Sequence, residues 1–255
     1  MQRHARHIAL EQIGVDGQAR IGDSTALIIG LGGIGCATAS YLACAGVRQL
    51  LLCDFDTVDE TNLGRQTLYG PADVGQLKAV RAASRLAAMN PDVSLIEIPE
   101  RLSDEALAEA VSQADIVLDG CDNFATRFQV NHAAVVGSTA LVSGAAIRLE
   151  GQLAVFGPDF GKSPCYRCLY QEADESLESC SGNGVLSPVP GVIGTMMAVE
   201  ALKSLAGLEV EIGMLSIYDA MSTEWRKLSI RKRRGCPSCA CLLYTSDAAD
   251  EVSPV

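Results

Sequence analysis

Residues 26–65 constrain the fold of this chain more than any other stretch. They open with a short apolar segment, residues 26–29, which predicts a β-strand. A G-x-G-x-x-G pattern follows directly, at Gly30, Gly32 and Gly35. Glycines at this spacing let the backbone turn tightly and approach a phosphate group, provided that a helix and a second strand come next.

Both required elements follow. Residues 33–46 are rich in alanine and glycine, which suits a helix packed closely on a sheet, and residues 50–53 predict the second strand. That strand ends in Asp54, where a carboxylate can accept hydrogen bonds from a ribose. Gly33 opens the helix, whose N-terminus favours the negative charge of phosphates. The sequence therefore predicts a nucleotide site, although this motif alone does not say which nucleotide binds.

Strands and helices continue to alternate along the chain. The further expected helices cover residues 4–21, 76–89, 104–113, 122–136 and 192–206, and the expected strands cover 93–98, 115–118, 140–143, 152–156, 214–218 and 224–230. This order predicts an α/β fold with a doubly wound, Rossmann-like sheet and a closing C-terminal β-hairpin. A length of 255 residues suits one large domain. The long polar loop over residues 56–75 is of the kind that usually has a function.

Composition excludes several classes of function. A formal net charge of −11 argues against general nucleic-acid binding, which favours a basic surface. No apolar run reaches the roughly 18 residues that a membrane span needs, and no signal peptide opens the chain. We therefore expect a cytoplasmic protein without a membrane partner. In that compartment the ten cysteines are expected to be thiols or metal ligands rather than disulfides.

The polar residues that follow the glycine pattern leave two kinds of enzyme open. One is a nicotinamide-dependent dehydrogenase, but its proton-transfer group would have to be His132, which lies in the middle of a predicted helix. The other binds a triphosphate, because acids and cations are unusually dense here and suit a phosphate under attack. The residues concerned are Asp54, Asp56, Asn62, Arg65 and Lys78.

Two C-x-x-C pairs lie far apart in the sequence. They are Cys165 with Cys168, and Cys236 with Cys239. Four thiolates on two tight turns match a closed tetrahedral zinc site, which would tie the C-terminal hairpin to the loop near residue 165. The competing interpretation is a redox-active C-x-x-C, which a single pair would leave open but two pairs disfavour.

Residues 241–255 continue no periodicity. The string CLLYTSDAADE resembles the translation of a sequencing adapter. We therefore expect one domain over residues 1–240 and a non-native, unpacked tail over residues 241–255.

Several motifs resemble one known family. GLGGIG, DFDTV followed by NLxRQ, the later Lys78 and LDGCDNFATR resemble the bacterial E1-like adenylyltransferase family, over residues 1–240. The resemblance implies ATP-dependent adenylation of the C-terminal glycine of a ubiquitin-like sulfur-carrier protein that ends in Gly-Gly. It also implies a separate sulfur donor.

Two branches of this family are similar to the chain. LVSGAAIRLEGQLAVF, PCYRCL and IYDAM resemble the molybdopterin-synthase branch, whereas DNFATR and residues 224–226 look more like the thiamine branch. We expect the carrier to be the molybdopterin-synthase small subunit, which places the chain in molybdenum cofactor biosynthesis. The thiamine-pathway carrier is the alternative within the family.

The resemblance also implies roles for individual residues. Gly33 would lie against the phosphates, Asp54 would hold the ribose, and Asp122 would bind Mg²⁺. The full set expected to contact ATP comprises Gly30, Gly32, Gly33, Gly35, Asp54, Asp56, Asn62, Arg65, Lys78, Asp122 and Asn123. An inactive scaffold would have lost Arg65, Lys78 or Asp122, and all three are present.

Two further catalytic residues rest on the resemblance alone. Arg6 matches the family arginine that reaches the ATP of the neighbouring subunit, which implies a homodimer with composite sites. Cys180 matches a family cysteine in the context C-x-x-x-G-V, which in some relatives forms a covalent bond with the activated carrier or a sulfur donor. Gly64 departs from the usual glutamine of N-L-Q-R-Q, and we expect the Arg65 contact to survive this change.

Overall fold

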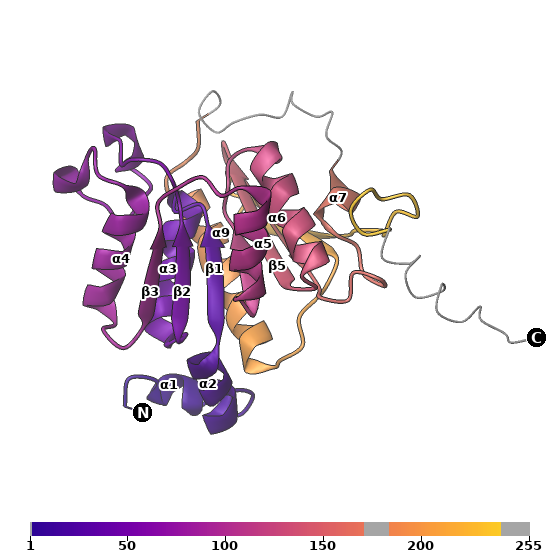
Figure 1. Ribbon diagram of the computed structural model, residues 1–255, viewed down its shortest axis with the longest axis horizontal. Coiled ribbons are helices and arrows are strands. Elements are labelled where there is room, and N and C mark those ends of the chain that lie inside the picture. Colours follow the sequence, from indigo (N-terminus) through magenta and orange to yellow (C-terminus); the bar gives the residue numbers. More distant parts are fainter. Residues whose placement is uncertain (1, 171–183, 241–255) are drawn as a thin grey trace, which may run out of the picture.

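The computed structural model describes residues 2–170 and 184–240 (Figure 1). Their strands form one eight-stranded sheet in the order β3-β2-β1-β4-β5-β6-β7-β8. The strands are β1 (Thr25–Ile29), β2 (Gln49–Cys53), β3 (Ser94–Ile98), β4 (Ile116–Asp119), β5 (Ala140–Ile147), β6 (Glu150–Phe156), β7 (Met214–Asp219) and β8 (Glu224–Ser229). From β3 to β5 all neighbours are parallel, and from β5 to β8 all are antiparallel.

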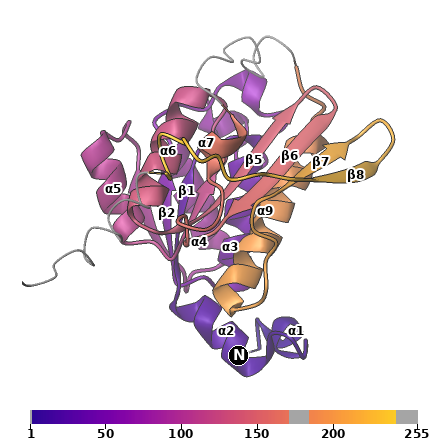
Figure 2. The ribbon, with the colours of Figure 1, turned by 90° about the vertical axis from the view of Figure 1, so that its right-hand side faces the viewer.

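Helices cover both faces of this sheet, as the expected doubly wound fold requires. They are α1 (Ala5–Ile8), α2 (Gly14–Asp23), α3 (Gly33–Ala45), α4 (Lys78–Met89), α5 (Asp104–Ser112), α6 (Phe124–Val136), α7 (Tyr166–Leu169) and α9 (Pro188–Ala206). One apolar core lies under α3, α4 and α9, and a second lies under α5 and α6. The antiparallel strands extend the sheet beside α9 and α7 (Figure 2). The predicted fold class is confirmed.

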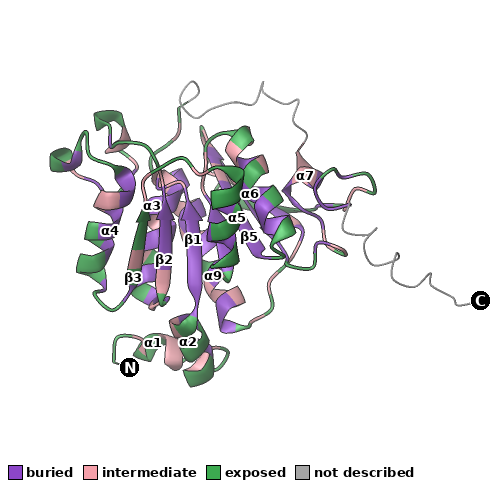
Figure 3. Cartoon of the chain, in the orientation of Figure 1, coloured by how far each residue is buried: buried purple, intermediate pink, exposed green. Residues whose placement is uncertain are grey.

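The central strands are apolar except for Thr25 at the start of β1 and Asp119 at the end of β4, because helices cover both of their faces. Every residue of β1 and of β4 is buried, whereas the outer faces of α4 and α5 are exposed (Figure 3). Continuous apolar runs of this kind are typical of parallel strands inside a doubly wound sheet.

Helix α9 is a core helix of the fold. Among the described residues it is the one helix long and apolar enough to cross a membrane by length and composition, so the expectation that no segment meets this test is wrong. Half of that segment is buried, and the helix packs against α3, α2, β5 and β6. Its apolar composition is thus explained by packing within the protein.

The structure corrects two predicted elements. The single helix expected over residues 4–21 is two short helices, and α2 begins at Gly14, which has a left-handed conformation with φ of +57°. Strand β5 continues beyond residue 143 through Gly144 and two alanines, which have little preference for strands. There it packs under α9 so closely that a Cβ atom on Gly144 would lie 2.4 Å from Met197 Sδ.

Candidate active site

The site lies where the strand order of the sheet reverses. β1 and β4 are neighbours in the sheet, although β2 and β3 come between them in sequence. The connections that follow two adjacent strands here run to opposite sides of the sheet. Such an arrangement leaves a crevice at the carboxyl ends of those two strands. A cavity of about 880 Å³ lies there, with Gly30 at the end of β1 and Gly120 at the end of β4 in its wall.

The glycine turn after β1 forms one side of this cavity. Gly30 has φ of +85°, and a Cβ atom there would lie 3.0 Å from the backbone of Gly120. Gly32 and Gly33 also line the cavity, at the N-terminus of α3. Gly35 does not line it, because it lies against the turn itself, where a Cβ atom would come within 1.9 Å of the Gly30 carbonyl oxygen. The turn therefore depends on Gly35 for close packing rather than for contact with a ligand.

Asp54 stands at the end of β2 and faces the cavity. Its Oδ2 accepts a hydrogen bond from the Leu31 N–H at 2.7 Å, and its Oδ1 accepts one from the Asp56 N–H at 2.9 Å. Burial raises the pKa of Asp54, although Lys78 and these two N–H groups oppose the shift. Each oxygen keeps a second lone pair, so the carboxylate is fixed in place and can still accept hydrogen bonds from a ligand.

The cations of the site come from the loop between β2 and α4, and from the first residue of α4. Lys78 is buried and its Nζ lies 3.0 Å from Asp56 Oδ2. Arg65 donates from Nη1 to the Thr61 carbonyl at 3.0 Å. Asn62 closes a capping interaction by accepting from the Asp59 N–H at 3.3 Å. The cavity is lined by Asp56, Asn62, Arg65 and Lys78, but not by Asp59.

A second cavity of about 90 Å³ adjoins the first. Both are lined by Gly30, Asp54, Asp56, Cys121 and Asp122, so the two lie side by side at the end of β2.

The wall of the smaller cavity is partly apolar and includes Phe55, with the Arg101 guanidinium 4.4 Å from the ring centre. Asp122 is exposed, and it accepts a hydrogen bond from Asn123 Nδ2 at 3.4 Å. Asn123 lines only this smaller cavity, and its Oδ1 caps α6 by accepting from the Thr126 N–H at 2.9 Å.

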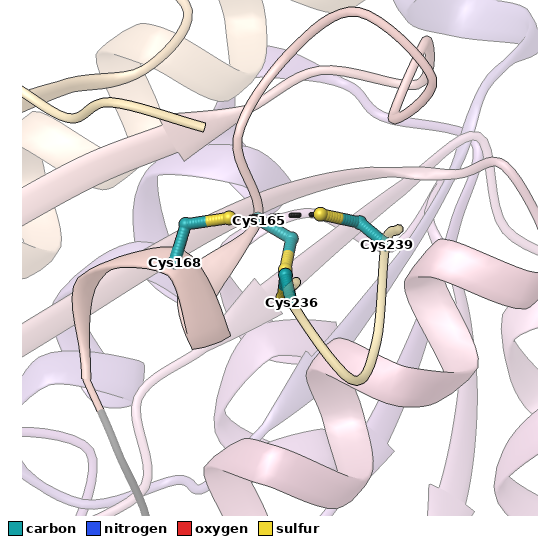
Figure 4. Close-up of side chains that lie close together, drawn as sticks. All are labelled: Cys165, Cys168, Cys236 and Cys239. Carbon is teal, nitrogen blue, oxygen red and sulfur yellow. Dashed lines mark hydrogen bonds between the residues drawn. The ribbon is translucent and has the colours of Figure 1, made fainter. Parts of the chain in front are cut away.

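The four predicted metal ligands lie together (Figure 4). All are buried thiols, and their Sγ atoms lie within 4.8 Å of one another. Cys165 Sγ is 3.6 Å from Cys236 Sγ, and Cys168 Sγ is 3.6 Å from Cys239 Sγ. Zinc–sulfur bonds of about 2.3 Å in a tetrahedron place sulfur atoms about 3.8 Å apart, so these thiols fit a zinc ion. The cluster joins the segment around α7, which follows β6, to the segment after β8.

The chemistry of the thiols also suits a metal. The hydrogen bond between Cys165 and Cys168 lowers the pKa of Cys168 and raises that of Cys165, and burial raises the pKa of Cys239. Of these three thiols, Cys168 is therefore the one favoured as a thiolate without help from a cation, and a bound cation would favour the thiolate form of the others. Thiolates are the form in which cysteine binds zinc. The redox interpretation would need one exposed C-x-x-C, whereas both pairs here are buried and meet each other.

Comparisons with known proteins identify the family. A family model described as "ThiF family" matches residues 4–239. The chain belongs to this family. It is an ATP-dependent adenylyltransferase, and the alternative of a nicotinamide-dependent oxidoreductase is overturned by this match.

Relatives in the ThiF family carry closely related names. The "Sulfur carrier protein ThiS adenylyltransferase" of Escherichia coli (strain K12) is 44% identical over 237 residues, covering 93% of this chain and 94% of that protein. The "Molybdopterin-synthase adenylyltransferase" of the same strain is 44% identical over 240 residues, covering 94% and 96%. The mouse protein "Adenylyltransferase and sulfurtransferase MOCS3" is 40% identical over 240 residues, covering 93% of this chain and 51% of that protein.

A solved structure has the same fold. The crystal structure of E. coli MccB with ATP matches with a TM-score of 0.82 and 22% sequence identity, over 93% of this chain and 73% of that one. At that identity the likeness concerns the fold alone.

Among the lining residues that were not predicted for the cavity of this ThiF-family chain are Arg127 and Gln66. Arg127 is buried under the cavity and donates to Asp119 Oδ2 at 3.3 Å, to Ser143 Oγ at 3.0 Å and to the Gly144 carbonyl at 2.8 Å. It therefore ties the end of β4 to β5. The motif DNFATR contained this arginine, but its contacts depend on a strand that lies later in the sequence.

Gln66 was also missed. It is 3% exposed and lines the larger cavity, and its Oε1 has no hydrogen-bond partner among the residues that the structure describes. A Cβ atom on Gly32 would lie 3.7 Å from its Nε2, so the amide stands beside the glycine turn.

Two residues singled out in the sequence analysis, Arg6 and His132, line neither cavity. Arg6 is exposed on α1. Helix α1 lies at the amino ends of the parallel strands (Figure 1), whereas the cavity lies at their carboxyl ends. His132 is exposed on α6 and lines neither cavity. Cys180 lies outside the described residues, as do residues 241–255. Gly64, where the family usually has glutamine, is exposed, and a Cβ atom there would meet nothing within 4 Å.

Proposed function

We propose that this protein adenylates the C-terminal glycine of a ubiquitin-like sulfur-carrier protein, the small subunit of molybdopterin synthase, in the cytoplasm. The observation that carries the proposal is one cavity that contains a glycine turn, an acid and two cations. These are Gly32 and Gly33, Asp54, and Arg65 with Lys78. Relatives named for this reaction support the same conclusion.

ATP would bind across both cavities. Asp54 would accept hydrogen bonds from the ribose hydroxyls, and the base would enter the smaller cavity beside Phe55. The phosphates would then extend over Gly32 and Gly33 toward Asn62, Arg65 and Lys78. Support for this direction comes from Asp54, which lines both cavities.

Gln66 and Asp122 would complete the phosphate site. The Gln66 amide stands beside Gly32, where it can donate to a phosphate oxygen without adding charge. Asp122 presents an exposed carboxylate to both cavities, and carboxylate oxygens suit Mg²⁺. A bound Mg²⁺ would neutralise phosphate charge. Asn123 would hold the Asp122 carboxylate through the hydrogen bond between their side chains.

The reaction needs positioning and charge rather than a covalent enzyme group. A carboxylate oxygen of the carrier's terminal glycine attacks the α-phosphorus of ATP, the bond to the β-phosphate oxygen breaks, and pyrophosphate leaves. Negative charge develops on the α-phosphate oxygens and on the leaving group. Lys78 and Arg65 would stabilise that charge from fixed positions, which costs little reorganisation during the reaction.

The carrier's tail would enter the larger cavity beside residues that do not line the smaller one, which include Ala145, Gln152, Tyr166 and Tyr170. The Tyr170 hydroxyl donates to Gln152 Oε1 at 2.5 Å, which fixes these two side chains relative to each other. A tail ending in Gly-Gly is narrow enough to pass between such side chains and reach the α-phosphate from this side.

We further propose a homodimer in which Arg6 of the partner subunit completes the site. Helix α1, which carries Arg6, lies at the opposite end of the sheet from the cavity of its own chain, so Arg6 would have to act on another copy. Its guanidinium would add a third cation to the triphosphate. The Arg6→Ala variant should therefore lose exchange activity, and mixing it with a Lys78→Met variant should restore part of that activity through hybrid dimers.

Cys180 stays a proposal for the step after adenylation. The described residues that flank its segment, Tyr170 and Gly184, both line the larger cavity. A thiolate there would displace AMP from the carrier's acyl-adenylate, forming a thioester. The Cys180→Ser variant should keep pyrophosphate exchange and lose any thioester adduct that hydroxylamine cleaves.

Sulfur would come from a separate protein. We also propose that residues 1–240 are the domain and that the remaining residues are not native, since the family model ends at residue 239. Resequencing the locus tests this, because a genomic reading frame for the same tail would refute it.

The thiamine-pathway carrier is the second candidate, because the relative named for ThiS is as similar to this chain as the one named for molybdopterin synthase. ATP–pyrophosphate exchange with each purified carrier distinguishes them. We expect exchange with the molybdopterin-synthase small subunit. Exchange only with the thiamine carrier would change the pathway and leave the mechanism, whereas exchange with neither would refute the proposed reaction.

A further inference from the structure

One charged side chain reaches into the cysteine cluster. Lys232, in the segment between β8 and Cys236, is half-buried, and its Nζ donates to Cys239 Sγ at 3.3 Å. Among the described residues it is the one charged side chain with a hydrogen bond to these thiols. A second donor is the backbone N–H of Arg233, which lies 3.4 Å from Cys168 Sγ.

The same ammonium group also joins the two segments that carry the cysteines. Nζ donates to the carbonyl of Phe160 and, at 3.2 Å, to that of Ser163, both of which precede Cys165 in the chain. It also lies 3.4 Å from the Cys239 carbonyl oxygen. Lys232 therefore links one C-x-x-C segment to the other without any metal.

The positive charge of Lys232 would also compensate for negative charge in the cysteine cluster. Four thiolates around one Zn²⁺ carry a net charge of about −2, and here all four are buried. Burying a net charge is costly unless an opposite charge or hydrogen bonds compensate for it. An ammonium group that donates a hydrogen bond to one thiolate compensates for part of that negative charge at the sulfur atom.

Neighbouring cations do not share this role. Arg231 and Arg234 are exposed on either side, and the Arg233 guanidinium donates to the Arg167 carbonyl at 3.3 Å instead. These arginines carry the same charge at a similar place in the sequence, so they are matched controls for Lys232.

We propose that Lys232 is a positioning residue of the zinc site, which holds the Cys239 thiolate by a charge-assisted hydrogen bond and slows loss of the metal. The inference rests on the proposed zinc ion. Mutation of a residue that hydrogen-bonds to a metal ligand typically changes metal affinity by about 10- to 100-fold.

The test compares full-length Lys232→Met with Arg234→Met. Zinc content is measured first, and then the rate of zinc transfer to a chromogenic chelator under reducing, non-denaturing conditions. We expect the wild type and Arg234→Met to release zinc at the same rate, and Lys232→Met to release it about 10- to 100-fold faster. Equal rates in all three proteins, or equally fast release from both variants, would overturn the inference.

A second readout separates the hydrogen bond from simple loosening of the loop. In cobalt-substituted protein, the sulfur-to-cobalt charge-transfer band reports electron density on the thiolates, and it should shift in Lys232→Met but not in Arg234→Met. If Lys232→Met fails to fold, Lys232→Arg keeps the charge with different geometry, and its band should shift while the fold is retained. An unshifted band would overturn the inference. Wild-type protein without zinc would instead refute the zinc site itself.

Discussion

Replacing Lys78 by methionine should separate activity from stability. The substitution removes the ammonium group and keeps a side chain of similar length in a position that is 6% exposed. The one ion pair lost joins Nζ to Asp56 Oδ2 at 3.0 Å, and the Asp56 side chain is 55% exposed. Because solvent screens such a pair, its loss should cost about 1 kcal/mol or less in unfolding free energy. The melting temperature should fall by less than about 4 °C.

The reaction should respond far more strongly. An ammonium group about 4 Å from a developing phosphate charge interacts with it by about 4 kcal/mol at the effective dielectric constant near a protein surface. Removing one such donor typically lowers a rate about 10²–10³-fold. We therefore expect carrier-dependent ATP–pyrophosphate exchange to fall by that factor in Lys78→Met.

A matched control lies on another loop. Lys162 also pairs with a neighbouring aspartate, with Nζ 3.0 Å from Asp159 Oδ2, but neither residue lines a cavity. Lys162→Met should leave both exchange and melting temperature unchanged. Exchange within about threefold of wild type in Lys78→Met would refute the role of Lys78 in the reaction. An equal loss of exchange activity in both variants would indicate that the effect comes from the change in overall charge.

Three further perturbations test other parts of the account. Gly35→Ala should unfold the nucleotide turn, since its Cβ atom would lie 1.9 Å from a backbone oxygen. Gly64→Ala has open space around the added Cβ atom and should be neutral or stabilising by about 0.4–1 kcal/mol. Thermal unfolding compares the two variants, and equal stability would contradict the packing argument. The pKa of Asp73 is lowered by a backbone N–H group and by a neighbouring arginine, so its contribution to stability is present above the ordinary aspartate pKa of about 3.9 and is lost as pH falls below it. Denaturant unfolding between about pH 5 and pH 2 should therefore show a shallower pH dependence in Asp73→Asn, and an unchanged slope would count against this. Cys168→Ser should lower zinc content and melting temperature together, and full zinc occupancy in that variant would remove it as a ligand.

Much of the fold was predictable because the signals are local. The apolar run before Gly30 and the acid at Asp54 mark the ends of two buried strands, and the structure places β1 and β2 within one residue of the expected bounds. The four cysteines were also predictable as a cluster, since two C-x-x-C pairs favour one metal site regardless of the structure of the residues between them.

Other features depend on contacts between distant segments. Arg127 is held by Ser143 and Gly144, on a strand that was predicted to end at residue 143. Gln66 becomes part of the site only because its loop folds back over Gly32. Neither relation leaves a periodic pattern in the sequence, so periodicity and motif spacing missed both residues. Lys232 was missed for the same reason, because its partners lie in a loop near residue 160.

The central claim is that the carrier's terminal carboxylate is joined to AMP, and intact-mass spectrometry of the carrier tests it directly. Purified protein would be incubated with ATP, Mg²⁺ and the molybdopterin-synthase small subunit, with a carrier lacking its last glycine as the control. We expect a carrier mass increased by one adenylate, with release of pyrophosphate, and no change in the shortened carrier. An unmodified full-length carrier, or equal modification of both carriers, would contradict it.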